Sequence, residues 1–243
     1  MHKTETLKII DAIEKSKCIL FDMDGVLLQS EELNWLVYKR AFETVLDCRL
    51  SSNYRSFFQG TRARDSVPKL LEALYVDEAE CLQNLFSEMR RIKLEMILQA
   101  PCLKTPDIDE FLECLRSMDK QLGLVTSTSS EMTNFMISHL KLKQFFSVVL
   151  TADCVQNGKP HPEGYLKAAS LLDIASPSEC LVWEDSPAVV SNLLKLGFNV
   201  IFVREHPDEK EANHSHFLET GQENLSLILN SLKERHKRTQ QCV

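Results

Sequence analysis

The stretch that decides the fold is Cys18-Ile-Leu-Phe-Asp22-Met-Asp24-Gly25-Val-Leu-Leu28, an apolar run that ends in two carboxylates and a glycine. Side chains two residues apart in a strand point to the same side, so Asp22 and Asp24 are expected to project together. One carboxylate can attack while the other moves a proton, and Gly25 lets the chain turn sharply beyond them. A buried strand that ends in a solvated, aspartate-rich turn is also common, so this stretch alone does not establish a site.

The second half of the chain alternates short apolar runs with segments of helical periodicity. The expected strands span residues 122–126, 147–150, 180–183 and 199–203, and the expected helices span residues 107–118, 130–140, 163–172 and 187–196. Short strands separated by helices of about ten residues predict an α/β fold with a doubly wound, Rossmann-like parallel sheet. The strand before Asp22 should join that sheet.

Between the first strand and this alternating region, the sequence predicts helices alone. Ser30, followed by Glu31 and Glu32, resembles a helix N-terminus, and a helix to about Leu46 is expected. Apolar residues recur at helical spacing in segments 64–74 and 77–97, and the pattern breaks at Ala100-Pro101 and Thr105-Pro106. We therefore predict an all-helical cap domain, residues 30–101, inserted into a core domain made of residues 1–29 and 102–243.

The two ends of the chain are less informative. An amphipathic helix is expected at residues 4–15 and a last helix at residues 225–232. Residues 204–222 are polar and weakly patterned, so they predict no strand. His214 and His216 lie in this segment, and two histidines in a polar loop are far more often solvated than bound to a metal.

The composition is that of an ordinary soluble protein, with 44% hydrophobic and 26% charged residues among 243. A formal net charge of −7 argues against a nucleic-acid partner, since no basic face dominates. No run of about 20 apolar residues predicts a membrane span, and the eight cysteines include no Cys-x-x-Cys pair. We expect a cytoplasmic protein, monomeric or weakly oligomeric, without a membrane partner.

Polar residues follow several of the expected strands at the point where each strand ends. Asp22 and Asp24 follow the first strand, Thr126-Ser127 the second, and Glu184-Asp185 the fourth. Ligands of open parallel sheets bind outside the carboxyl ends of the strands. The sequence therefore predicts a site at this edge of the sheet.

Four motifs carry a resemblance to a known family. They are Phe21-Asp22-Met-Asp24-Gly25-Val-Leu, Val125-Thr126-Ser127, Gly158-Lys159-Pro160-His-Pro162-Glu163 and Trp183-Glu184-Asp185-Ser186. In this order the sequence resembles the haloacid dehalogenase-like phosphohydrolases, in the subgroup with a helical cap inserted after the first strand. The motifs span most of the chain, and the cap is the least diagnostic part.

The resemblance implies a role for each acidic residue. Asp22 looks like the nucleophile, which forms an aspartyl-phosphate, and Asp24 looks like the general acid and base. A Mg²⁺ ion would bind the Asp22 side chain, the Asp24 backbone carbonyl and Asp185. Glu184 would bind the ion directly or through water.

The resemblance also implies groups that hold the phosphate. Thr126 would donate its hydroxyl to a phosphoryl oxygen, and the backbone N–H of Ser127 would help to hold the anion. Lys159 would neutralise the Asp22 carboxylate and the transferring group. Our best expectations for cap contacts to the substrate are Phe57, Phe58, Gly60, Thr61 and Arg62.

Two positions depart from the family pattern. Many relatives have an acid where Gln29 stands and a glycine where Val189 stands. The Val189 change is expected to alter helix packing behind the metal. Neither change removes a catalytic group, so activity is still expected.

The segment from Thr151 to Leu166 resembles sugar- and polyol-phosphate phosphatases, which suggests a small-molecule phosphate ester as substrate. Asp24 argues against a dehalogenase, because dehalogenases of this family lack an acid at this place. Phosphonate-cleaving relatives use a cap lysine, and no cap lysine here has a distinguishing context.

Two further alternatives stay open. Sugar-phosphate mutases similar to beta-phosphoglucomutase share all four motifs, but the place of their phosphate-binding cap arginine falls on Ala63, between Arg62 and Arg64, which favours hydrolysis. A binding or regulatory protein that keeps the fold without turnover is the second alternative. The intact catalytic acids and Lys159 argue against it.

Overall fold

The structure, a computed structural model, describes residues 3–58, 61–100, 103–204 and 218–241. The chain divides into two compact units. One unit, the core domain, consists of Met1–Leu28 and Lys104–Val243, and the other, the cap domain, consists of Gln29–Leu103.

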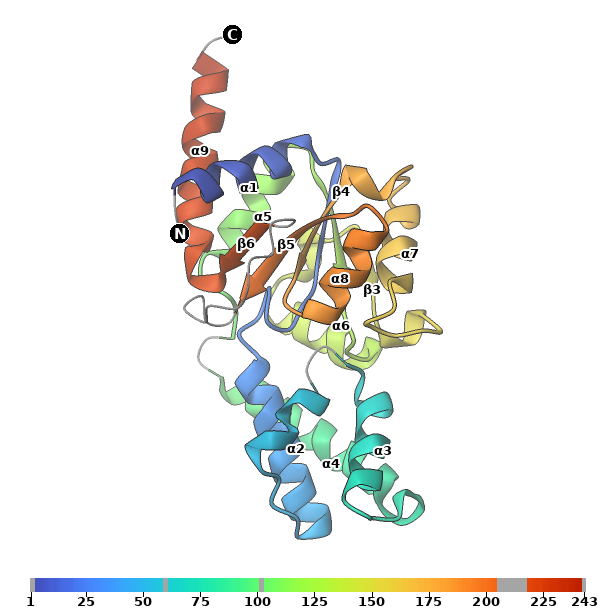
Figure 1. The fold of residues 1–243 in the computed structure, drawn as a ribbon. Helices are drawn as coiled ribbons and strands as arrows, with labels where there is room; N and C mark the ends of the chain where they lie inside the picture. The colour runs from blue at the N-terminus through green and yellow to red at the C-terminus, as the bar shows by residue number, and fades with distance from the viewer. Residues whose placement is uncertain (1–2, 59–60, 101–102, 205–217, 242–243) are drawn as a thin grey trace. The chain divides into compact units, whose positions relative to one another are not determined.

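Six parallel strands in the described residues form the sheet of the core domain, in the order β3-β2-β1-β4-β5-β6 (Figure 1). Their bounds are β1 (Cys18–Phe21), β2 (Gln121–Val125), β3 (Val148–Leu150), β4 (Cys180–Glu184), β5 (Asn199–Arg204) and β6 (Leu218–Gly221). From β1 the chain adds β2 and β3 on one side, then crosses to add β4, β5 and β6 on the other. The predicted doubly wound α/β fold is confirmed, and its strand order reverses between β1 and β4.

Strand β6 was not predicted, because its sequence Leu-Glu-Thr-Gly lies in the polar segment 204–222. It is an edge strand that pairs in parallel with β5 alone among the described strands. Backbone hydrogen bonds to one neighbour do not require an alternating apolar pattern, so periodicity could not reveal it. His214 and His216 lie outside the described residues.

The last helix, α9 (Leu225–Gln241), is longer than expected. Leu225, Ile228, Leu229 and Leu232 bury one side of its first half. Its polar second half reaches α1 (Lys3–Lys15) through Arg235, whose Nη1 lies 2.6 Å from Asp11 and whose Nη2 lies 3.0 Å from Glu14. Apolar periodicity gives no information about ion pairs with a distant helix. The sequence pattern therefore indicates only the first half of α9.

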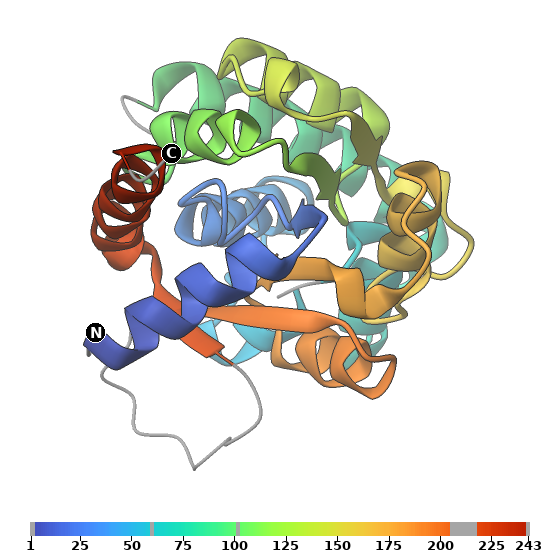
Figure 2. The same ribbon diagram turned by 90° about the horizontal axis from the view of Figure 1, so that it is seen from above.

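Helices cover both faces of the sheet. Figure 2 shows α9 beside α1 and α5 (Ile108–Ser117), and both of these helices contact α9. Of the remaining core helices, α7 (Glu163–Leu171) packs against β2 and β3, and α8 (Pro187–Lys195) packs against β5. The other helical elements of the core are α6 (Ser130–His139) and the short 3-10 turns η2 (Lys143–Phe145), η3 (Ala152–Cys154), η4 (Pro177–Glu179) and η5 (Gln222–Asn224).

Neighbouring residues of β1 point to opposite faces, and each face has its own apolar cluster. On one face, the ring centroid of Phe21 lies 6.0 Å from that of Trp183 and 6.5 Å from that of Phe111 on α5. The rings of Phe111 and Trp183 lie 5.3 Å apart. These aromatic contacts attach α5 to the two central strands.

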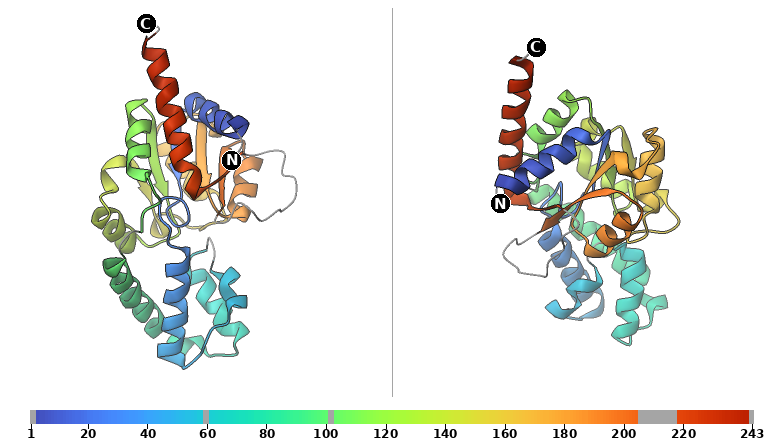
Figure 3. Two further views of the ribbon diagram at one scale, coloured as in Figure 1. Left: turned by 90° about the vertical axis from the view of Figure 1, so that its left-hand side faces the viewer. Right: turned by 45° about the horizontal axis from the view of Figure 1, so that its top comes forward.

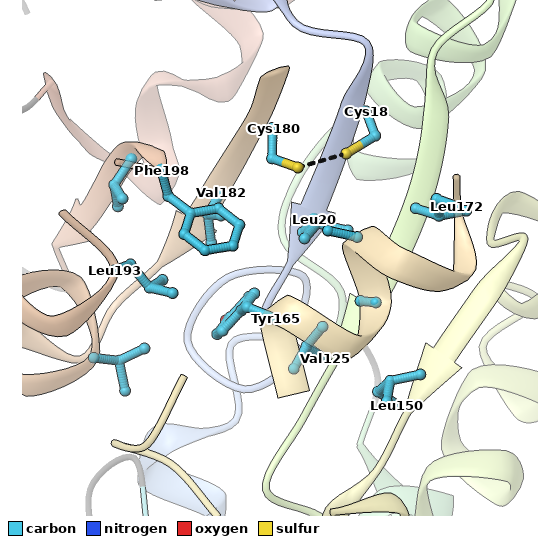
Figure 4. Close-up of a cluster of buried hydrophobic side chains, with 14 of the residues drawn as sticks. Cys18, Leu20, Val125, Leu150, Tyr165, Leu172, Cys180, Val182, Leu193 and Phe198 are labelled. Carbon is cyan, nitrogen blue, oxygen red and sulfur yellow. Dashed lines mark hydrogen bonds between the residues drawn. The ribbon is translucent and has the colours of Figure 1, made fainter. Parts of the chain in front are cut away.

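On the other face, Leu20 lies in a buried cluster with Val182 of β4 and Tyr165 of α7 (Figure 4). Cys18 and Cys180 are register partners in this cluster, with their sulfur atoms 3.2 Å apart. A hydrogen bond with Cys180, together with burial, raises the pKa of the Cys18 thiol. Both groups are buried free thiols that pack as small apolar side chains.

The described part of the cap domain is helical. Its long helices, α2 (Glu31–Leu46) and α4 (Glu78–Gln99), pack against each other (Figure 3). The 3-10 turn η1 (Ser52–Phe57) precedes α3 (Ala63–Ala73), which contacts α4. Within the described part of the chain, no helix combines the length and the apolar character that crossing a bilayer requires.

Replacing Phe111 by alanine should lower the free energy of unfolding by about 3–5 kcal/mol, because the change leaves a cavity between α5 and the sheet. Urea unfolding followed by circular dichroism measures this loss. Leu171→Ala is a matched control, because Leu171 is 57% exposed and its removal should change stability by no more than about 0.5 kcal/mol. Equal effects of the two changes would contradict the role of the aromatic cluster.

Candidate active site

The sheet brings three acidic side chains together at the carboxyl ends of β1 and β4. Asp22 follows β1 directly, and its N–H donates to the Trp183 carbonyl at 2.9 Å, so the two strands stay in register to their ends. Oxygen atoms of Asp22, Glu184 and Asp185 all lie within 4.8 Å of one another. This group stands where the strand order reverses, which is where open α/β sheets bind their ligands.

Lys159 inserts its ammonium group between two of these carboxylates. Its Nζ pairs with Asp22 and lies 2.7 Å from Glu184. The exposed fractions are 9% for Lys159, 6% for Asp22 and 1% for Glu184. The motifs that were far apart in the sequence therefore meet in one buried ionic cluster.

Burial and charge act in opposite directions on the pKa values of this cluster. Burial works to lower the pKa of Lys159, but the charges of Asp22 and Glu184 outweigh it and raise that pKa. Burial raises the pKa of Asp22 to about 8 against the opposing charge of Lys159, and the charges of Glu184 and Asp24 add to the increase. The pocket concentrates more negative charge than Lys159 balances.

Glu184 uses both of its oxygens within the protein. Oε2 accepts from Lys159 and from the hydroxyl of Tyr165, while Oε1 accepts from the N–H groups of Asp185 at 3.1 Å and Ser186 at 3.0 Å. Burial works to raise the pKa of Glu184, but Lys159 and these hydrogen bonds outweigh it and lower that pKa. Glu184 is therefore a fixed carboxylate that orients Lys159.

The sequence alone does not indicate a role for Tyr165. It is fully buried on α7, and burial together with the negative charge of Glu184 raises its pKa, which keeps the hydroxyl a neutral donor. A buried tyrosine needs a hydrogen-bond partner for its hydroxyl. The apolar face of α7 indicates in the sequence that Tyr165 is buried. The identity of that partner depends on the sheet and could not be inferred from α7 alone.

Gly25 leaves the space that Asp185 occupies. It has a φ of +81°, and a Cβ atom built at this position would lie 2.2 Å from Oδ2 of Asp185. Its carbonyl accepts from the side-chain amide of Gln222, which follows β6. Gln222 was also missed, because nothing in its local sequence indicates a contact with a turn almost 200 residues away.

The loop after β2 approaches the loop after β1. Thr126 is buried, its N–H donates to the Leu150 carbonyl at 2.8 Å, and its hydroxyl oxygen accepts from the N–H of Thr128 at 3.1 Å. The hydroxyl of Thr128 donates to Oδ2 of Asp24, also at 3.1 Å. The half-buried Ser127 lies between these two threonines, and Thr128 itself was not singled out by the sequence.

The expected substrate contacts of the cap have other partners within that domain. Arg62 is buried and its Nε lies 2.5 Å from Asp65, while the hydroxyl of Thr61 donates to the Phe57 carbonyl at 3.0 Å. Phe58 is buried against Tyr38, with ring centroids 3.7 Å apart. Gly60 lies outside the described residues, and the role of the cap residues in binding substrate stays a prediction.

The two departures from the family pattern have different surroundings. Val189 is fully buried on α8 and packs in the apolar cluster that contains Tyr165. Gln29 is exposed, and its N–H donates to the Leu103 carbonyl at 2.8 Å. Neither side chain belongs to the buried ionic cluster.

Comparison with known proteins identifies relatives over most of the chain. A phosphorylated carbohydrates phosphatase of Thermotoga maritima is 31% identical over 190 residues, which are 76% of this chain and 84% of the relative. The beta-phosphoglucomutase of Bacillus subtilis is 25% identical over 192 residues, which are 77% of this chain and 83% of that enzyme.

A solved structure shares the fold. CbbY from Rhodobacter sphaeroides, crystallised in complex with phosphate, superposes with a TM-score of 0.73 at 20% identity and covers 87% of this chain and 99% of its own. Residues 19–203, which carry all four motifs, match the family described as haloacid dehalogenase-like hydrolase. The resemblance inferred from the motifs is confirmed, and the chain belongs to the haloacid dehalogenase-like hydrolases.

Proposed function

We propose that the protein is a Mg²⁺-dependent phosphatase that hydrolyses a small phosphorylated metabolite, a sugar or polyol phosphate, through an aspartyl-phosphate. The observation that carries this proposal is the buried Asp22 carboxylate, paired with Lys159 beside Glu184 and Asp185 and followed two residues later by Asp24. The similarity to a phosphorylated carbohydrates phosphatase supports the substrate class.

In the first step, a carboxylate oxygen of Asp22 forms a bond to phosphorus while the bond from phosphorus to the leaving oxygen breaks. Asp24 gives its proton to that oxygen, so the alcohol leaves neutral. In the second step, Asp24 takes a proton from water as the water attacks phosphorus. This releases inorganic phosphate and regenerates the Asp22 carboxylate.

The surrounding groups stabilise charge on the phosphoryl group. Lys159 supplies a compact positive charge that Glu184 holds in place, and charge stabilisation is most of what catalyses phosphoryl transfer. We assign to Thr126 and to the N–H of Ser127 the binding of phosphoryl oxygens. Each of these groups lies in the core domain.

Mg²⁺ suits this donor set, because a hard divalent cation prefers carboxylate and carbonyl oxygens. Asp22, Asp185 and the Asp24 carbonyl would hold the ion, and Glu184, whose oxygens already accept four hydrogen bonds, would act through water. When bound, Mg²⁺ neutralises negative charge on the phosphoryl group. The absence of a side chain at Gly25 keeps Asp185 available to the ion.

A sugar-phosphate mutase is the alternative function, because a beta-phosphoglucomutase is among the relatives. A mutase returns the phosphoryl group to a bound sugar phosphate and must hold a second phosphate. In mutases of this family, an arginine of the cap is expected to bind the second phosphate. Ala63 stands at the place of that arginine here, and the neighbouring Arg62 pairs with Asp65. These observations favour hydrolysis over a mutase. The presence of the catalytic acids and Lys159 in one cluster argues against a non-catalytic binding protein.

The free thiols of the described cysteines agree with a reducing compartment, and we propose that the enzyme acts in the cytoplasm.

The wild-type protein should release p-nitrophenol from p-nitrophenyl phosphate in the presence of Mg²⁺, and chelation with EDTA should remove this activity. Asp22→Asn should lower kcat by at least about 1,000-fold, because an amide does not replace the nucleophile. Unchanged hydrolysis by Asp22→Asn would contradict the proposed nucleophile. Wild-type protein without activity on any phosphorylated metabolite would instead support the non-catalytic alternative.

Gly25→Ala should raise the Mg²⁺ concentration needed for half-maximal activity by about 10-fold or more, because the new Cβ displaces a metal ligand. Gly197→Ala is the matched control: Gly197 has a φ of +84°, but nothing lies within 4 Å of a Cβ built there. Both changes carry backbone strain of about 1–2 kcal/mol, and only Gly25→Ala should change the Mg²⁺ dependence. A calorimetric titration with Mg²⁺ gives a readout independent of turnover.

Phosphatase and mutase make different products from glucose 1-phosphate with a trace of the bisphosphate. A phosphatase should release inorganic phosphate and glucose, because water accepts the phosphoryl group. Accumulation of glucose 6-phosphate without free phosphate would overturn the proposed hydrolysis. Phosphorus NMR distinguishes the products directly.

A further inference from the structure

Thr128 is held in a fixed place beside the proposed acid. Its carbonyl accepts from the N–H of Ala152 at 3.0 Å and from the hydroxyl of Thr133 at 3.4 Å. Its own N–H donates to the Thr126 hydroxyl oxygen at 3.1 Å. Because both the carbonyl and the N–H of Thr128 are hydrogen-bonded, the loop after β2 fixes the position from which the Thr128 side chain extends.

The side chain of Thr128 reaches across to the neighbouring loop. Its hydroxyl donates to Oδ2 of Asp24 at 3.1 Å, and this contact joins residues 104 positions apart in the sequence. Asp24 is half-buried and follows β1, and β2 is one of the two strands that pair with β1. The hydrogen bond restricts the rotamer of the Asp24 carboxyl group, and displacement of a reacting group by as little as 1 Å can lower a rate by about 10²-fold.

The contact also makes the two oxygens of Asp24 different. In a protonated carboxyl group, the carbonyl oxygen is the better hydrogen-bond acceptor, and the other oxygen carries the proton. A hydroxyl that donates to Oδ2 therefore favours the proton on Oδ1. We propose that Thr128 is a positioning residue that holds Oδ2 of Asp24, so that Oδ1 delivers the proton to the leaving alcohol oxygen; this inference rests on the proposed phosphatase function.

The proton balance is the same as in the proposed reaction. When the bond between phosphorus and the leaving oxygen breaks, its electron pair goes to that oxygen, which takes the proton from Oδ1 of Asp24. Oδ1 later takes a proton from the attacking water. Thr128 keeps its own proton throughout and donates to Oδ2 in both steps.

Leaving groups that differ in their need for a proton test this role. p-Nitrophenolate leaves without protonation, whereas phenolate is more basic and depends more on the acid, and the two substrates have nearly the same size. The ratio kcat/KM reports the steps up to cleavage of the ester bond, so later hydrolysis of the aspartyl-phosphate does not obscure it. Thr128→Val keeps the branched shape of threonine and removes the hydroxyl.

For Thr128→Val, kcat/KM should fall about 10- to 100-fold with phenyl phosphate and no more than about threefold with p-nitrophenyl phosphate, since general acid catalysis contributes about 10²- to 10⁴-fold. Thr128→Ala should show the same bias, and Thr128→Ser, which keeps the donor, should restore the wild-type ratio. Asp24→Asn provides the reference and should show a larger bias toward p-nitrophenyl phosphate. Circular dichroism confirms that each variant is folded.

An equal loss with both substrates for Thr128→Val, or no loss with either, would overturn the positioning role. If Asp24→Asn shows the leaving-group bias while the Thr128 variants do not, the phosphatase function stands and only the role of Thr128 falls. Failure of the wild-type protein to release phosphate from either ester and from every phosphorylated metabolite tested would overturn the proposed function and this inference together.

Discussion

The site depends on one buried interaction, the pairing of the Lys159 ammonium group with Asp22 and Glu184. Removing two carboxylates and an ammonium group from water is unfavourable, and their mutual attraction offsets this only when the geometry is good and the remaining donors and acceptors are satisfied. Tyr165 and the backbone N–H groups of Asp185 and Ser186 meet that condition at Glu184. The cluster therefore holds the proposed nucleophile, Asp22, in place. Burial of its charged groups is unfavourable, and the surrounding fold must offset that free energy.

That free energy comes from packing on both faces of the sheet. The rings of Phe21, Trp183 and Phe111 fill one face, and Leu20, Val182 and the apolar part of Tyr165 fill the other. Leu20 and Phe21 immediately precede Asp22 in β1, and Val182 and Trp183 immediately precede Glu184 in β4. Apolar contacts that stabilise the sheet thus also fix the backbone from which the acidic side chains extend.

The same sheet explains why the loops are arranged as they are. The carboxyl ends of parallel strands lie at one edge of the sheet, so the loops after β1, β2 and β4 meet there although they are far apart in the sequence. Gly25 allows Asp185 to approach the β1 loop, and Thr128 of the β2 loop bonds to Asp24 of the β1 loop. A mutation in one loop is therefore expected to act on chemistry assigned to another.

The sequence by itself determined the fold class, the strands β1 to β5 and the order of the four motifs, because apolar periodicity and short polar motifs are local properties of the chain. It did not reveal β6, which pairs as an edge strand without an apolar pattern, or the second half of α9, which ion pairs attach to α1. Tyr165, Thr128 and Gln222 act through partners on other elements, so only the tertiary structure decided their contacts. Hydrogen bonds and ion pairs between distant residues depend on strand register and on the position of each loop in space, and neither is encoded in the local pattern.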